Sequence, residues 1–171
     1  MIGKFVRGFV DGSLSTLGIV IGASAASSWI IVAAGVGGAL ANGVSNVLGA
    51  LSAERIDQYR ELREVERAMV SQELKGSALD GKIRKETVAG GMVDGLATMA
   101  GGAIPILPYL ALDPDHAVFV SIALVIVEVF VLGLYLGKLS RENILFSAVK
   151  MAVFAMAIAV VVYVVQLVIV P

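Results

Sequence analysis

Two aspartates in closely similar sequence contexts are the residues of this chain that most clearly suggest chemistry. Residues 8–18 read GFVDGSLSTLG and residues 91–101 read GMVDGLATMAG, so Asp11 and Asp94 share a motif at an offset of 83 residues. Each aspartate lies in an apolar stretch that is long enough to cross a membrane. A carboxylate inside a bilayer is costly and usually marks an ion or proton path. The pair therefore predicts a transporter that contains a duplicated helical hairpin.

Further polar side chains occur in the same apolar stretches. Asn42 and Asn46 share one helix face at i, i+4 spacing, and Glu128 lies in a later stretch. Carboxylates and amide carbonyls are hard oxygen ligands that suit divalent cations. We therefore predict a cation site inside the membrane that is formed by Asp11, Asn42, Asn46, Asp94 and Glu128.

A purely structural role for these polar groups is the alternative. Amide and hydroxyl groups join helices inside membranes, and Arg7 precedes Asp11 by one helical turn, where the two side chains can form an ion pair. Carboxylates in apolar helices are harder to explain in this way, because their burial is expensive.

A second group of carboxylates lies in the charged segment between the apolar stretches. Glu54, Asp57, Glu61 and Glu64 recur at steps of three and four residues, so they share one face of a predicted helix. Such a face is either a solvated amphipathic surface or a weak cation-collecting surface that feeds the membrane path. We include these four residues among the predicted metal ligands.

The composition is that of an integral membrane protein. Of the 171 residues, 58% are hydrophobic, the mean hydropathy is +0.90, and most charged residues lie between Glu54 and Glu86. A membrane-spanning helix needs about 20 mainly apolar residues. The predicted fold is an all-α protein with five transmembrane helices, including a duplicated helical hairpin, and a short helical cytoplasmic segment between helices 2 and 3. The five predicted spans are 8–27, 30–52, 88–110, 117–137 and 144–170.

This pattern divides the chain into four regions. They are a first transmembrane hairpin (1–53), a cytoplasmic acidic helical segment (54–86), a second transmembrane hairpin (87–137) and a fifth transmembrane helix (138–171). With a cytoplasmic N-terminus, the 13 Lys and Arg residues fall on the inner side or at the inner edge of a span, as positive charges in membrane proteins generally do. The C-terminus then lies on the opposite side of the membrane.

Several function classes find no support in the residues. The chain has no cysteine, which excludes disulfides and thiolate metal sites. It has no phosphate-binding loop. Its basic residues follow the tendency of Lys and Arg to remain on the cytoplasmic side of a membrane, so they do not indicate a nucleic acid partner. We expect neither an enzyme nor a permanently bound cofactor, and we expect the lipid bilayer, protons and divalent metal ions as partners.

The chain resembles the vacuolar iron transporter family. Residues 7–20 are similar to the first helix of that family, 41–54 to its second, 101–109 (GGAIPILPY) to a segment of its third, and 132–151 to the region that joins the fourth and fifth. The resemblance implies a five-helix homodimer that exports Fe²⁺ or Mn²⁺ from the cytosol in exchange for protons. It also implies an acidic cytoplasmic region that gathers metal.

The chain departs from the family pattern in two places. The second helix has Ser45-Asn46 and Gly49-Ala50-Leu51 where the family usually reads Ser-Met and Gly-Glu-Tyr, and the cytoplasmic region is short. Loss of the thioether favours harder ions such as Mn²⁺, Mg²⁺ or Ca²⁺. Two alternatives to divalent-cation transport stay open: a membrane scaffold or assembly protein without transport activity, and a proton-coupled carrier of an organic solute.

Overall fold

Five membrane-spanning helices make up the part of the chain that the structure describes, residues 1–68 and 78–169. In the computed structural model these are α1 (Ile2–Gly22), α2 (Ser28–Ala68), α3 (Ala78–Ala103) with the 3₁₀ helix η1 (Ile104–Leu110), α4 (Pro114–Leu139) and α5 (Ile144–Ile169). Each is long and apolar enough to cross a membrane, α3 doing so together with η1. The predicted all-α fold with five spans is confirmed, and the protein is a multi-pass integral membrane protein.

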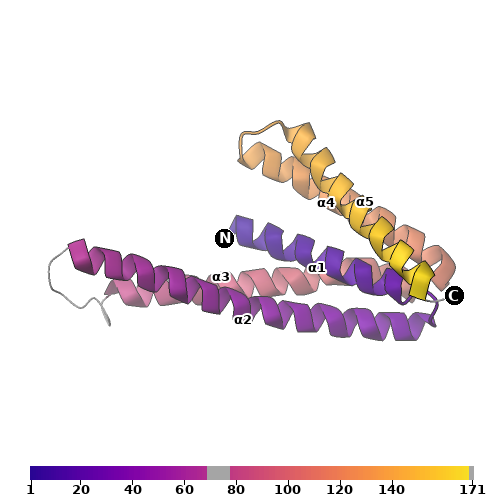
Figure 1. Ribbon diagram of the computed structural model, residues 1–171, viewed down its shortest axis with the longest axis horizontal. Helices are drawn as coiled ribbons and strands as arrows, with labels where there is room; N and C mark the ends of the chain where they lie inside the picture. The colour runs from indigo at the N-terminus through magenta and orange to yellow at the C-terminus, as the bar shows by residue number, and fades with distance from the viewer. Residues whose placement is uncertain (69–77, 170–171) are drawn as a thin grey trace.

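The helices run back and forth and form two groups (Figure 1). α1, α3 and α5 run in one direction, and α2 and α4 run in the other. In this view α1 lies between the α2–α3 pair and the α4–α5 hairpin and contacts both groups, and η1 at the end of α3 also packs against α4.

The second helix is much longer than a membrane is thick. α2 has 41 residues, which corresponds to a length of about 60 Å. Only Ser28–Ala53 is apolar enough to span, and the charged continuation extends past the start of α1 together with the first turns of α3 (Figure 1). The charged segment of the sequence is therefore helical on both sides of residues 69–77.

Two prolines explain why the third span changes its helix type. Pro105 is the second residue of the 3₁₀ helix and Pro108 lies within it. A proline cannot donate the backbone hydrogen bond that an α-helix needs. The Pro105 carbonyl accepts a hydrogen bond from the Ser121 hydroxyl of α4 at 2.7 Å. A neighbouring helix thus satisfies a polar backbone group inside the membrane, as spanning helices require.

The hydrophobic core lies where the second half of α1 meets η1, α4 and α5. Leu17, Val20 and Val125 are fully buried there, and Ile106 and Ala155 join them. The polar side chains Asp11, Ser13 and Ser15 come earlier in α1, where Val10 and Leu14 still pack against this core.

Close contact between the backbones of α1 and α3 sets the geometry of the polar region. A Cβ atom at Gly8 would overlap the carbonyl oxygen of Asp94, and one at Gly12 would overlap the carbonyl oxygen of Thr98. Small residues of this kind let membrane helices approach closely. The glycines of the first motif therefore place α1 directly against the helix that carries the second motif.

Candidate functional site

The first aspartate is the centre of a polar cluster between α1 and α2. Asp11 Oδ2 accepts hydrogen bonds from the amide nitrogens of Asn42 at 3.1 Å and Asn46 at 2.7 Å. The Asn42 amide also donates to the Ser15 hydroxyl at 2.8 Å. Asp11 and Ser15 are one helical turn apart on α1, and the two asparagines are one turn apart on α2, so two i, i+4 pairs face each other.

The same cluster reaches α3 through a hydroxyl group. Asn46 donates to Thr98 Oγ1 at 2.9 Å, and Thr98 donates to the backbone carbonyl of Asp94 at 2.9 Å. Each asparagine thus uses its two amide hydrogens within the cluster. The carbonyl oxygen of each amide, which is the atom that can bind a cation, is not used by these hydrogen bonds.

The second aspartate has very different surroundings. Asp94 is 1% exposed and its carboxylate is paired with the guanidinium of Arg7 from α1. Arg7 Nε lies 3.3 Å from Oδ1, and Arg7 Nη2 bonds Oδ2. The i, i+4 spacing had made Arg7 a candidate partner of Asp11; in the structure its hydrogen bonds go to Asp94, which is 87 residues away in sequence.

The third carboxylate lies on the other side of α1. Glu128 of α4 accepts a hydrogen bond from the Ser13 hydroxyl at 2.6 Å, and its second oxygen is buried with no hydrogen-bond partner among the described residues. Ser13 follows Asp11 by two positions, which corresponds to a rotation of about 200° around the helix. The structure therefore brings Asp11, Asn42 and Asn46 together and places Glu128 behind α1.

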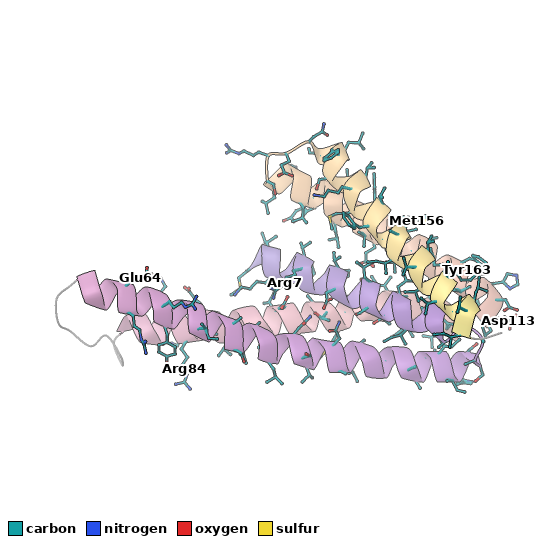
Figure 2. The ribbon with its side chains drawn as sticks, viewed as in Figure 1. Arg7, Glu64, Arg84, Asp113, Met156 and Tyr163 are labelled. Carbon is teal, nitrogen blue, oxygen red and sulfur yellow. The ribbon has the colours of Figure 1, made fainter. Side chains whose placement is uncertain are left out.

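The predicted ligands on the charged extension of α2 are only partly described. Glu64 is exposed and lies near the far end of α2, well away from Asp11 (Figure 2). The side chains of Glu54, Asp57 and Glu61 lie outside the described residues. Within the described part of the chain, no group of three or more His, Asp or Glu side chains converges closely enough to hold a metal ion.

The polar face of α1 borders an open pocket of about 400 Å³ between α1 and the α4–α5 hairpin. Arg7 and Asp11 are the charged residues that line it, and the other lining residues are apolar or glycine: Gly3, Val6, Val10, Leu14, Leu136 and Met151. Arg7, Asp11 and Ser15 are all exposed, although they lie in a membrane span. Asp11 thus belongs both to this pocket and to the cluster with Asn42, Asn46 and Ser15, whose carboxylate, amide and hydroxyl oxygens are hard ligands.

The sequence pointed to Arg7 but paired it with Asp11, whereas the structure pairs it with Asp94. Its partner comes from another helix and could not be read from spacing along α1. Ser15 and Thr98 also belong to the cluster, and a signal for them exists, because they occupy matching positions in the two motifs.

Comparison with known proteins identifies relatives of the chain. A sequence model of the VIT family, the vacuolar iron transporters, matches residues 50–167. The chain is also similar to an uncharacterized protein of Methanocaldococcus jannaschii, with 42% identity over 164 residues that cover 94% of this chain and 86% of that protein. The stretch matched by the family model begins after Asn46, so the cluster around Asp11 rests on the geometry described above.

Proposed function

The chain belongs to the VIT family of membrane metal transporters, and we propose that it moves a divalent cation, Fe²⁺ or Mn²⁺, out of the cytosol in exchange for protons. One observation carries this proposal: Asp11, Asn42 and Asn46 converge inside apolar spans. A charged side chain in a membrane span is expensive and is kept mainly where it serves an ion path.

The ligand chemistry favours a hard or borderline cation. Asp11 contributes an anionic oxygen, and rotation of the two amides presents their carbonyl oxygens to an arriving ion. Asn46 stands where a methionine would offer a soft sulfur ligand. Oxygen ligands suit Mn²⁺ and Fe²⁺ and do not favour soft ions.

A second copy of the chain completes the site in this proposal. Arg7, Asp11 and Ser15 would face lipid in a monomer, which their charge and polarity make unfavourable. The adjoining exposed face of α2 is built of small residues that permit close helix contact: Ala34, Gly37, Ala41, Ser45 and Gly49. Two copies that meet on these faces bring two Asp11 carboxylates together, and two negative charges offset the desolvation of a divalent ion.

Proton exchange is proposed because a further carboxyl group lies within the spans. Glu128 is separated from Asp11 by the body of α1, so a metal and a proton have different carboxyl groups available to them. Carboxyl groups within membrane spans are common members of proton relays.

The acidic face of α2 completes the proposed path on the cytoplasmic side. Glu54, Asp57, Glu61 and Glu64 lie on the part of α2 that extends beyond the span. With the N-terminus in the cytoplasm, this extension gathers cations next to the entrance of the path.

Metal uptake by purified protein in sealed vesicles tests the proposal. We expect Mn²⁺ and Fe²⁺ to enter vesicles that contain the wild-type chain and a proton gradient, and we expect Asp11→Asn to remove this flux. Asp115→Asn is the matched control, because Asp115 is an exposed aspartate in the first turn of α4 and lies outside the cluster. Absence of uptake for every divalent metal tried would overturn the proposal in favour of a scaffold or a carrier of organic solutes.

A further inference from the structure

Arg7 stands between the two motif aspartates. It lies on the exposed face of α1 one helical turn before Asp11, and its side chain extends toward α3 (Figure 2). There the guanidinium donates hydrogen bonds to both carboxylate oxygens of Asp94. The Arg7 side chain is 66% exposed and the Asp94 side chain only 2%, so the guanidinium covers the carboxylate.

We propose that Asp94 is a positioning residue that holds Arg7 away from Asp11, and that it is not a ligand of the transported cation. In this arrangement the Asp94–Arg7 pair keeps the carboxylate of Asp11 free for a metal ion. The inference rests on the proposed metal site at Asp11 and adds a residue that determines whether that site is accessible to a cation.

The position of Asp94 makes it a poor ligand. Both carboxylate oxygens are bonded to Arg7, and one of them lies against Gly8 at the contact between α1 and α3. A cation would have to displace the guanidinium and enter a contact where there is no room for a single added carbon atom. A guanidinium that binds both oxygens of a carboxylate is a strong and geometrically specific partner.

Asp11 is the alternative partner for Arg7 when Asp94 loses its charge. Residues four apart on a helix are neighbours on its surface, so the Asp11 carboxylate lies within reach of the Arg7 side chain. The two side chains line the same pocket, whose other lining residues are apolar or glycine. An unpaired cation in such surroundings is costly, so a released Arg7 moves to the remaining carboxylate.

Occupation of Asp11 by Arg7 would block the metal site. The guanidinium neutralises the one carboxylate of the cluster and repels a divalent cation at short range. The neutral part of the cluster does not depend on the charge of Asp94, because Thr98 bonds the backbone carbonyl of residue 94 and Asn46 bonds Thr98. Asp94→Asn therefore changes the partner of Arg7 and leaves the hydrogen bonds from Asn46 to Thr98 and from Thr98 to the backbone in place.

A pair of variants tests the inference through loss and rescue. The full-length chain is compared as wild type, Asp94→Asn and the double variant Arg7→Gln with Asp94→Asn. Mn²⁺ is the probe. Its binding is measured in detergent from the electron paramagnetic resonance signal of the free ion, and its transport is measured in vesicles. The double variant is used because removal of Arg7 alone would leave a buried unpaired carboxylate, which is strongly destabilising.

We expect Asp94→Asn to raise the apparent Kd and KM for Mn²⁺ by roughly tenfold or more, since it moves a positive charge onto the site. Removal of that charge in the double variant should return both constants to within about threefold of the wild type. The matched control is the double variant Lys82→Gln with Glu86→Gln. It removes an exposed ion pair on α3, in which Lys82 Nζ and Glu86 Oε1 are 4.0 Å apart, and it should leave both constants unchanged.

Two results would overturn the inference while the wild type binds and transports Mn²⁺. One is an equal loss in the single and the double variant, which would make Asp94 a ligand or a structural residue. The other is normal Mn²⁺ binding by Asp94→Asn. A wild-type chain that neither binds nor moves Mn²⁺ contradicts the proposed function itself, so the two failures are distinguishable.

Discussion

The two copies of the aspartate motif occupy different environments, although their sequences are closely similar. Asp11 is exposed on α1 and receives amide hydrogen bonds from Asn42 and Asn46. Asp94 is buried and is paired with the guanidinium of Arg7. The first carboxylate has neutral amide groups as its hydrogen-bond donors, whereas the second is paired with the positively charged guanidinium of Arg7. The repetition of the motif therefore does not give Asp11 and Asp94 the same role.

The residues around each motif account for this difference. At the repeat offset of 83, the two asparagines of the first hairpin correspond to Val125 and Val129, which are buried in the apolar core. Arg7 corresponds to Gly90. The second hairpin therefore provides no amides for Asp94 from these positions, and its partner comes from the first hairpin.

The glycines of the motif behave more alike than the aspartates. Gly12 packs against the backbone of α3, and its counterpart Gly95 packs against Gly43 and Val47 of α2. Both copies thus use a glycine for close helix contact, which depends only on a missing side chain. The role of an aspartate depends on what lies opposite it, and that differs between the copies.

The largest expected effect is the loss of Mn²⁺ transport when the charge of Asp11 is removed. Asp11→Asn should lower Mn²⁺ transport by at least about a hundredfold, because even residues that only support metal ligands cost 10–100-fold when replaced. The variant should still fold, since the asparagine oxygen can accept the bonds from Asn42 and Asn46. Vesicle flux and thermal unfolding measure the two properties, and substantial transport by this variant would remove Asp11 from the proposed site.

The next effect concerns the contact that brings the two motifs together. Gly12→Ala should lower the free energy of unfolding by about 1–3 kcal/mol, because its Cβ overlaps the carbonyl oxygen of Thr98. Gly22→Ala at the end of α1 is the control, since a Cβ there meets nothing within 4 Å. Unfolding in detergent compares the two, and equal stability of both variants would contradict the close contact of α1 with α3.

A third variant makes the first hairpin resemble the second. Asn46→Val introduces the residue type found at the matching position 129 and removes a hydrogen bond to the charged Asp11. We expect the KM for Mn²⁺ to rise by about tenfold, in line with the strength of hydrogen bonds to charged groups. Leu48→Val, on the exposed face of the same helix, should have no such effect. A normal KM for Asn46→Val would mean that the amide does not support the site.

The smallest effect is expected outside the membrane. Joint replacement of Glu54, Asp57, Glu61 and Glu64 by glutamine should raise the KM for Mn²⁺ by only about twofold, because carboxylates in water bind cations weakly and salt screens them. The difference should disappear in high salt. Identical transport at low salt and low metal concentration would leave this face as a solvated helix surface.

Much of the fold could be predicted because it depends on local properties. The five apolar stretches identify the spans, since each helix must satisfy its own backbone groups in lipid. Pro105 and Pro108 indicate where the third span changes, and the structure has a 3₁₀ helix there. The i, i+4 spacing of Asn42 and Asn46 likewise anticipates that both side chains point in one direction, and both reach Asp11.

The residues in their order already establish the membrane class, the five helices, the two motif aspartates and the family resemblance, because hydrophobicity and motif spacing are properties of short segments. The partner of Asp94 and the separation of Glu128 from Asp11 are settled only when the helices pack. Arg7 has two carboxylates that it can pair with, and the glycine contact between α1 and α3 brings the more distant one in sequence within hydrogen-bonding distance. Which charged side chains pair across helices depends on the distance between the helix backbones, and the spacing of residues along one helix does not predict that distance.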